Sequence, residues 1–556
     1  MNHKTRQGRM LLPVLISAVA LFGGGVFGQD VSTSTVTTEQ GTVTGTVFQG
    51  GWREFRNIPF AEPPVGDLRW KAPKYPPTKY GSRKATTDVG YACCSQAPAN
   101  LGGPICNGSA SEDCLVLHVY TPASASKPNA SLPVMFWIHG GALIAGNAAQ
   151  SNGSNIVENF DVVLVKTNYR LNVFGFLGGE DLLQDAETGG LNFGFQDQVA
   201  ALKWVQINIA AFGGDPSKVT IYGESAGAIS VGWLTLIPQA EGLFHQVIME
   251  SGGPGSLDAN NPLSDFSVNG QYKKALKAFN ITDPKLTREQ RVAALRNVSE
   301  ADLTKWAATA ISAGLPTVDG VTIPTNSWQL LKDQKIHPNI RAVIIGDNEN
   351  EGTVFTYIYG NSYAIMQTLL NGTSSPQILP PDTTIGAEMW PEDWSKRVLD
   401  VYFQGRVGDS HKEFDGAGEI LGDFIFYSCD RYFAEAAIKS GKTVYKYRFN
   451  VNNTGVNLTD PAGNYFGAAH GSEVAFVCVF GFLDPTLADT DKRTSLAMVT
   501  RWTNFAIHGD PNYGINSTAA NTAWPVYTLP ERRMQLFGPN GTSTDIKEAD
   551  LHTYSG

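Results

Sequence analysis

Residues 219–234 constrain the fold more than any other stretch of this 556-residue chain. They open with a β-branched and aromatic run, VTIY at 219–222, which is typical of a buried strand. The motif GESAG follows at 223–227, and apolar residues that suit a buried helix come next. Two glycines flanking a serine permit a sharp strand-to-helix turn that side chains would obstruct. The segment therefore predicts that Ser225 is lifted to the end of a sheet as a candidate nucleophile.

Further apolar runs indicate what surrounds this turn. Continuous runs at 134–138, 162–165, 247–249 and 342–345 are typical of parallel strands covered by helices on both faces. Apolar residues in 197–209 recur at near-helical spacing, and TVYKYRF at 443–449 indicates a later strand. The Thr-, Val- and Gly-rich region 41–56 favours antiparallel strands at a sheet edge. We therefore expect an α/β fold with a mostly parallel central sheet flanked by helices.

Composition indicates a globular chain, with 42% hydrophobic and 17% charged residues. No linker, charge block or internal repeat divides the sequence. We expect one large domain over 29–556, with helical and loop insertions.

The first 28 residues differ in composition from the rest of the chain. Lys4, Arg6 and Arg9 precede the apolar stretch 10–22, and small residues follow near Gly28. This pattern predicts a secretory signal peptide over 1–28, because the apolar stretch is too short for a convincing membrane span. Cleavage removes three positive charges, so the net charge of -10 becomes -13. That balance argues against nucleic acid or an anionic membrane surface as a partner.

Two other features fit a secreted protein, for which we expect no stable membrane anchor. None of the six cysteines sits in a C-x-x-C pair, as expected for disulfides in an oxidising compartment. Asn-x-Ser/Thr sequons behind a signal peptide predict surface glycans. The ten sequons are at Asn107, Asn129, Asn152, Asn280, Asn297, Asn371, Asn452, Asn457, Asn516 and Asn540.

A nucleophilic serine needs a base, an acid that orients the base, and donors for an oxyanion. For the donors, the run 134–138 ends in HGGA at 139–142, where glycines leave backbone N–H groups uncovered. Of the nine histidines, His470 stands out, because it lies among small residues in FGAAHGSE at 466–473. For the acid, Asp347, Glu349 and Glu351 compete in the loop after 342–345, and composition does not select one. Serine, acid and histidine come in the chain order of the α/β-hydrolase triad.

With these motifs the chain resembles the type-B carboxylesterase/lipase family of the α/β-hydrolase superfamily, and we expect a secreted, fungal-type member. The similarity covers about residues 40–530. The matching segments are RNIPFA at 56–61, LRW at 68–70, SEDCL at 111–115, HGGA at 139–142, NYR at 168–170, FGGDP at 212–216, GESAG at 223–227, VDG at 318–320, DNENEG at 347–352, AHG at 469–471 and WTNFA at 502–506.

The resemblance implies roles for individual residues. The family's nucleophile falls on Ser225, its acid on Glu351 and its base on His470. Its oxyanion donors fall on the amides of Gly141, Ala142 and Ala226. The family often has a third glycine where this chain has Ala142, but an alanine amide can serve as the donor. Glu224 and Glu473 match carboxylates that line the family's gorge, and they fit a structural role as well as a catalytic one.

The resemblance also implies the pairing of some cysteines and one ion pair. Cys94 looks like the partner of Cys114, which leaves Cys93 with Cys106 as a second bridge. The pairing of Cys429 with Cys478 stays open. Arg69 and Glu112 look like the family's structural ion pair.

The activity implied is that of a secreted serine carboxylic ester hydrolase, acting on small-molecule or lipid esters without metal or cofactor. The 19 residues between Cys94 and Cys114 contain few large apolar residues, which favours an esterase for soluble or medium-chain esters over an interfacial lipase. They also contain no tryptophan, which disfavours a choline ester. A lipase or sterol esterase, with residues 310–315 along an acyl tunnel, is the alternative within enzymes. A catalytically inactive cholinesterase-like adhesion protein is the alternative of another class.

Overall fold

The computed structural model of the protein describes residues 30–85, 90–95, 110–151, 153–185, 189–256, 270–308, 315–370, 393–451, 459, 462–479, 488–518 and 521–552. The expected signal peptide over 1–28 lies outside these residues, as do 310–314 of the expected acyl tunnel.

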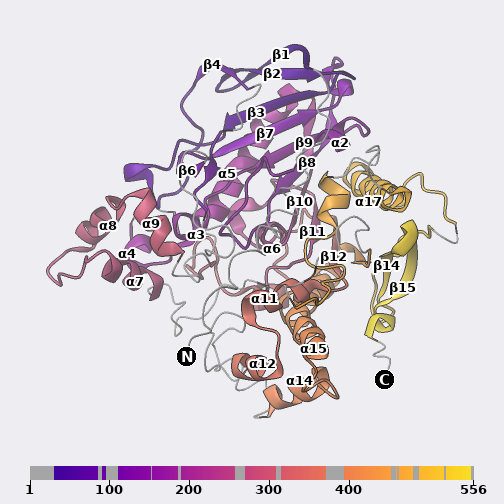
Figure 1. Ribbon diagram of the computed structural model, residues 1–556. Coiled ribbons are helices and arrows are strands. Elements are labelled where there is room, and N and C mark those ends of the chain that lie inside the picture. Colours follow the sequence, from indigo (N-terminus) through magenta and orange to yellow (C-terminus); the bar gives the residue numbers. More distant parts are fainter. Residues whose placement is uncertain are drawn as a thin grey trace.

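A single 13-stranded sheet runs through the described chain (Figure 1). Its order is β1-β2-β3-β7-β9-β8-β10-β11-β12-β13-β14-β15, with β4 beside β2. The strands are β1 (Asp30–Thr38), β2 (Gly41–Phe48), β3 (Arg53–Pro59), β4 (Gly81–Lys84), β7 (Val116–Thr121), β8 (Leu132–Ile138), β9 (Val163–Thr167), β10 (Gly214–Glu224), β11 (Gln246–Glu250), β12 (Ala342–Asn348), β13 (Thr443–Phe449), β14 (Arg533–Gly538) and β15 (Thr542–Lys547). A separate small sheet pairs β5 (Ala92–Cys93) with β6 (Ala110–Ser111).

The centre of the large sheet is parallel and its edges are antiparallel. Neighbouring strands pair in parallel from β9 through β8, β10, β11, β12 and β13 to β14. The strands β1, β2, β3 and β7 are antiparallel at one edge, and β15 is antiparallel to β14 at the other. This confirms the expected α/β class and the antiparallel edge around 41–56. The carboxyl ends of the central strands meet at one edge of the sheet, where ligand sites of such folds form.

The central strands are buried on both faces because their side chains alternate between two cores. Phe136, Ile221 and Val343 point to one face and pack with the first core, while Trp137, Tyr222 and Ile344 point to the other. The first core includes residues of α5 (Phe193–Asn208), α6 (Ala226–Leu234) and α16 (Ser428–Lys439), and the second includes residues of α17 (Asp489–His508).

Helices cover these faces and form the insertions. They are α2 (Ser154–Val157), α3 (Asn172–Phe176), α4 (Glu180–Leu183), α5 (Phe193–Asn208), α6 (Ala226–Leu234), α7 (Gly270–Ala278), α8 (Arg288–Arg296), α9 (Glu300–Ala307), α10 (Ser327–Lys332), α11 (Thr356–Tyr359), α12 (Tyr363–Leu370), α14 (Trp394–Tyr402), α15 (Ser410–Gly422), α16 (Ser428–Lys439) and α17 (Asp489–His508). Figure 1 shows α7, α8 and α9 as one group and α12, α14 and α15 as another. Among the described residues, none of the helices has the length and apolarity needed to cross a membrane.

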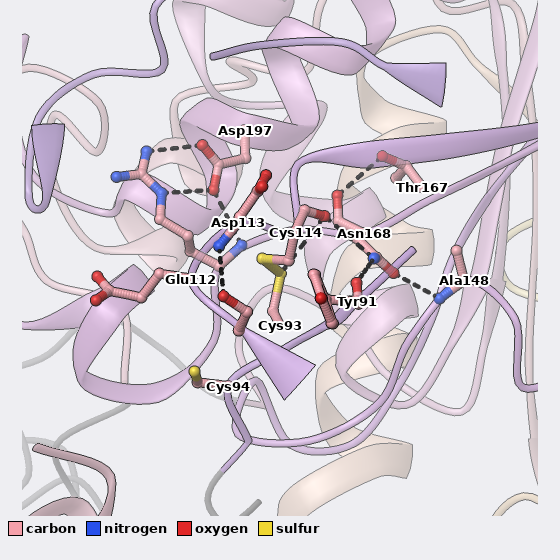
Figure 2. The surroundings of a disulfide bond; sticks show 12 residues. Tyr91, Cys93, Cys94, Glu112, Asp113, Cys114, Ala148, Thr167, Asn168 and Asp197 are labelled. Atoms are coloured by element: carbon pink, nitrogen blue, oxygen red, sulfur yellow. Dashed lines mark hydrogen bonds and ion pairs between the residues drawn. A yellow bond between two sulfur atoms is a disulfide. The ribbon is translucent and has the colours of Figure 1, made fainter. Parts of the chain in front are cut away.

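The disulfide that reaches Cys114 starts from Cys93, so the expected Cys94–Cys114 bond is wrong. Cys93 ends β5, and its Cα lies 5.0 Å from that of Cys114. Side chains of adjacent residues in an extended segment point to opposite sides. Cys93 and Cys114 therefore share the first core, whereas Cys94 packs in a different cluster with Trp70. Figure 2 shows Cys94 apart from the Cys93–Cys114 bond.

The second expected bridge, Cys93–Cys106, is wrong for the same reason. Cys94 is itself disulfide-bonded, and Cys106 lies outside the described residues. Cys429 and Cys478 are both buried, and no disulfide joins them.

Asn168, in the NYR motif, ties the disulfide to the next segment of the chain (Figure 2). Its Nδ2 donates to the carbonyl oxygens of Cys114 and Tyr91, each at 3.1 Å, and its Oδ1 accepts from the Ala148 amide at 2.8 Å. The expected ion pair also forms, since Arg69 Nε donates to Glu112 Oε2 at 2.7 Å. Both contacts are structural, because neither reaches Ser225.

Candidate active site

Ser225 stands at the sharp turn between β10 and α6. Its backbone has φ 56° and ψ -125°, a conformation that non-glycine residues rarely adopt. The turn is anchored because the Ser225 amide donates to the Glu250 carbonyl at 2.9 Å. A Cβ added at Gly223 would lie 2.4 Å from the Ile138 carbonyl oxygen, and one at Gly227 would lie 2.1 Å from it. Both glycines are therefore required by the close approach of β8.

His470 lies between Ser225 and Glu351. Its Nε2 accepts from the Ser225 hydroxyl at 2.7 Å, and its Nδ1 donates to Glu351 Oε2 at 2.6 Å. The imidazole packs against Phe426, with ring centroids 4.5 Å apart, and against Phe355 at 5.2 Å. The carboxylate on Nδ1 fixes the tautomer, so Nε2 is free to take the hydroxyl proton.

Of the three competing carboxylates, only Glu351 contacts the imidazole among the described residues. Its other oxygen accepts from the Asn348 amide at 2.6 Å, and its side chain is fully buried. Asp347 lies on β12, 3.9 Å from Lys446 Nζ. Glu349 is partly exposed and lies 3.9 Å from Arg448.

Hydrogen bonds from two asparagines connect the loop that carries Glu351 to the loop that carries His470. The Asn350 amide donates to the Ala468 carbonyl at 2.9 Å, and its Oδ1 accepts from the Ala468 amide at 3.0 Å. Asn348 Nδ2 donates to the Ala469 carbonyl at 3.0 Å. These bonds fix the separation of Glu351 and His470, which are 119 residues apart in sequence.

Two more glutamates lie close to the imidazole. Glu224 Oε1 is 3.3 Å from His470 Nε2, the nitrogen that also receives Ser225. Glu473 is fully buried, accepts from the Ser251 hydroxyl at 2.9 Å, and also bonds the Asn348 side chain. The sequence did not single out Ser251 or Asn348, although Asn348 falls within the acid loop.

This cluster changes the acid–base properties of the site. Burial lowers the pKa of His470, but the carboxylates of Glu224 and Glu351 outweigh it, so the pKa is raised above the ordinary 6.5. Burial raises the pKa of Glu224 above its ordinary value, and it does the same for Glu473 with help from the neighbouring carboxylates. Glu224 and Glu473 therefore hold a proton more readily than carboxyls in water, and the imidazole needs a higher pH to become a free base.

The loop after β8 lies directly against the serine. A Cβ added at Gly140 would lie 3.1 Å from the Ser225 Cβ. Gly141 has φ 105° and Ala142 has φ 55°, and both residues are exposed. Ala226 is the first residue of α6, where helix amides attract negative charge. In the part of the chain that the structure describes, no hydrogen bond uses the amide N–H of Gly141, Ala142 or Ala226.

His139 supports this loop and is unsuited to act as a base. Tyr169 donates its hydroxyl to the His139 carbonyl at 2.9 Å, and the two rings stack with centroids 4.4 Å apart. Burial lowers the pKa of His139 to about 4, so the ring stays neutral near pH 7.

No cluster of three or more His, Cys, Asp or Glu side chains suited to a metal ion occurs among the described residues. The arrangement consists of a serine on a strained strand-to-helix turn, a histidine and a buried glutamate at the carboxyl edge of an α/β sheet. This is the geometry of a serine hydrolase of the α/β-hydrolase class.

The chain belongs to the carboxylesterase family, because the family profile described as "Carboxylesterase family" matches residues 32–553. An acylcarnitine hydrolase of Mus musculus is 32% identical over 522 residues, which cover 90% of this chain and 86% of that protein. A human cocaine esterase is 34% identical over 532 residues, covering 92% and 89%. The crystal structure of a Geobacillus stearothermophilus carboxylesterase superposes with a TM-score of 0.73 at 28% identity, covering 92% of this chain and 98% of that chain. The protein is thus a carboxylic ester hydrolase of the type-B class.

Proposed function

We propose that the protein hydrolyses carboxylic esters through an acyl-enzyme on Ser225. His470 takes the hydroxyl proton as Ser225 attacks the ester carbonyl, and returns it to the departing alcohol. Water, activated by the same imidazole, then releases the acid. Glu351 keeps Nδ1 protonated and stabilises the imidazolium that forms in each half of the reaction.

The observation that carries this proposal is the continuous chain from Ser225 Oγ through His470 to Glu351, with links of 2.7 and 2.6 Å. The amides of Gly141, Ala142 and Ala226 are the proposed donors to the oxyanion. Their support is the exposure of Gly141 and Ala142 beside Ser225 and the position of Ala226 at the start of α6.

The substrates we propose are soluble or medium-chain esters. The two relatives, an acylcarnitine hydrolase and a cocaine esterase, are both named for the cleavage of carboxylic esters. The residues between Cys94 and Cys114 contain no tryptophan, which argues against a choline ester as the preferred substrate.

We also propose that the mature protein is a single secreted domain over 29–556, of fungal type. Four sequon asparagines within the described residues, Asn129, Asn280, Asn297 and Asn516, are exposed, as glycan attachment requires. The fungal-type assignment rests on the sequence resemblance. Mass analysis of the secreted product would test cleavage after Gly28 and the attachment of glycans.

A lipase or sterol esterase is the second candidate, favoured by the apolar residues at 310–315. Short- and long-chain nitrophenyl esters, assayed below and above their solubility limits, separate the two. A jump in rate only on emulsified long chains would favour the lipase.

Fluorophosphonate labelling tests the mechanism itself. We expect the native protein to be labelled once per chain and Ser225→Ala not to be labelled, with both proteins folded by circular dichroism. If the folded native protein fails to react, the proposed chemistry is wrong and the inactive adhesion protein becomes the better hypothesis.

A further inference from the structure

A π-helical turn interrupts the helix behind the acid loop. It spans Asp423–Tyr427, between α15 and α16. Such turns are rare, and they often occur at functional sites because the inserted residue redirects side chains. Here the turn places Phe426 against the His470 ring and Tyr427 against the loop that carries Glu351.

The Tyr427 hydroxyl contacts the backbone of the acid loop at three points. It lies 2.8 Å from the carbonyl oxygens of Asn348 and Glu349, to which its hydrogen can donate. It also accepts from the Glu351 amide at 3.2 Å. Burial raises the pKa of Tyr427 well above its ordinary value of 10, so the hydroxyl keeps its proton at working pH. One hydroxyl therefore joins the last residue of β12 to the acid itself.

Arg448 packs against the ring of Tyr427. Its Cζ lies 4.1 Å from the centre of the Tyr427 ring, which is close for a cation–π contact. Its guanidinium also donates to the Asn348 carbonyl at 3.2 Å and lies 3.9 Å from Glu349 Oε2. Arg448 is buried on β13, so this cation has a fixed position beside the loop.

The loop needs such a support because several acidic side chains crowd around one imidazole. Glu351 lies near Glu224 and Glu473, which also face His470. When Glu224 or Glu473 is ionised, its repulsion favours displacement of Glu351 away from the imidazole. The Asn348 amide reaches Glu351 Oε1 only while the loop keeps its shape.

We propose that Tyr427, held in place by Arg448, is a positioning residue for Glu351. It would fix the backbone of 348–351 so that the carboxylate meets His470 Nδ1. This inference rests on the proposed function and assigns no contact between Tyr427 and the ester.

The test compares Tyr427→Phe with the native protein on nitrophenyl acetate. Rates are expressed per active site titrated with fluorophosphonate, so misfolded molecules do not contribute. The variant keeps the ring that packs against Arg448 and loses only the hydroxyl. We expect kcat to fall about ten-fold while KM stays within about two-fold, because the acid is misplaced but the binding surface is intact. Tyr432→Phe, in α16 just after the π-helical turn, is the matched control, because its hydroxyl contacts only the Trp328 carbonyl among the described residues, at 3.5 Å.

The pH profile separates positioning from general loosening. A displaced Glu351 stabilises the imidazolium less, so the acid limb of kcat/KM in Tyr427→Phe is expected at lower pH than in the native protein. Glu224 and Glu473 also face His470, and the substitution leaves both of them unchanged. A variant that only loosens the fold would have fewer active sites that react with fluorophosphonate, and the acid limb of its kcat/KM profile would not move.

Arg448→Lys provides a second variant, because it keeps the charge but lacks the planar group that covers the ring. We expect a smaller loss of kcat and the same direction of the pH shift. The inference is overturned if Tyr427→Phe keeps native kcat and a native acid limb, or if it changes only KM. Ser225→Ala distinguishes failure of this inference from failure of the proposed function. If hydrolysis does not depend on Ser225, the proposed mechanism is wrong, regardless of the result for Tyr427→Phe.

Discussion

Glu224 Oε1 lies 3.3 Å from His470 Nε2, and the Ser225 hydroxyl lies 2.7 Å from the same nitrogen. The glutamate beside the nucleophile therefore contacts the base as well. A carboxylate at this distance stabilises the protonated imidazole. Sequence alone left Glu224 between a structural and a catalytic role, and this geometry gives it an electrostatic one.

The pH dependence of hydrolysis follows from this contact. Because the pKa of His470 is raised, the acid limb of the native kcat/KM profile is expected above pH 6.5. In Glu224→Gln one carboxylate is lost, the protonated imidazole is less stable, and the limb moves to lower pH. Profiles measured with nitrophenyl acetate check both statements. Glu241→Gln, at an exposed site, is the control and should leave the limb in place. Superimposable profiles for Glu224→Gln and the native protein would contradict the proposed role.

The choice of acid can be tested with matched amides. Glu351→Gln removes the charge that orients His470, and we expect kcat to fall about 10³- to 10⁴-fold. Glu349→Gln, two residues away, should stay within about three-fold, since its side chain faces Arg448 and does not contact the imidazole. Steady-state kinetics per titrated site measure both. Equal losses in the two variants would mean that the loop, rather than the carboxylate of Glu351, is what matters.

The parts of the fold predicted correctly from sequence are those set by local pattern. The runs at 134–138, 247–249 and 342–345 are strands because residues apolar on both faces stay buried only between two layers of helices. The alternating run in β13 is also a strand, but all of its residues except Thr443 are buried. Lys446 can be buried there because Glu548 Oε1 lies 2.7 Å from its Nζ, a partner that the sequence pattern does not reveal.

The errors arise where three-dimensional pairing decides between neighbours. Cys93 and Cys94 are equivalent in sequence, and only the pairing of β5 with β6 determines which one faces Cys114. Similarly, only the folded loop brings Glu351 rather than Asp347 or Glu349 to His470, and the resemblance rather than composition had selected it. The role of Tyr427 could not be predicted, because no motif marks this residue and only the folded π-helical turn brings its hydroxyl to the acid loop.

At the strand-to-helix turn, replacing a glycine by alanine is expected to destabilise the protein, although the same change in an ordinary helix stabilises it. In a helix, Gly to Ala normally stabilises by about 0.5–1 kcal/mol. At Gly227 the new Cβ would lie 2.1 Å from the Ile138 carbonyl oxygen, so we expect Gly227→Ala to destabilise by about 3 kcal/mol. Chemical denaturation measures the change. Gly242→Ala, where nothing lies within 4 Å but φ is +81°, isolates the cost of backbone strain, about 1 kcal/mol. Equal effects at the two sites would argue against the close approach of β8.

The corrected disulfide predicts different outcomes for two adjacent cysteines. Cys93→Ser breaks the bond to Cys114, which closes a loop with a sequence separation of 21 residues. Loss of such a loop constraint is expected to cost about 3 kcal/mol of unfolding free energy. Cys94→Ser should leave the Cys93–Cys114 bond intact, so peptide mapping under non-reducing conditions would still find it. In Cys93→Ser, by contrast, Cys114 should react with a thiol reagent after unfolding. If Cys114 is instead freed by Cys94→Ser and not by Cys93→Ser, the pairing expected from the family resemblance is right and the one in the structure is wrong.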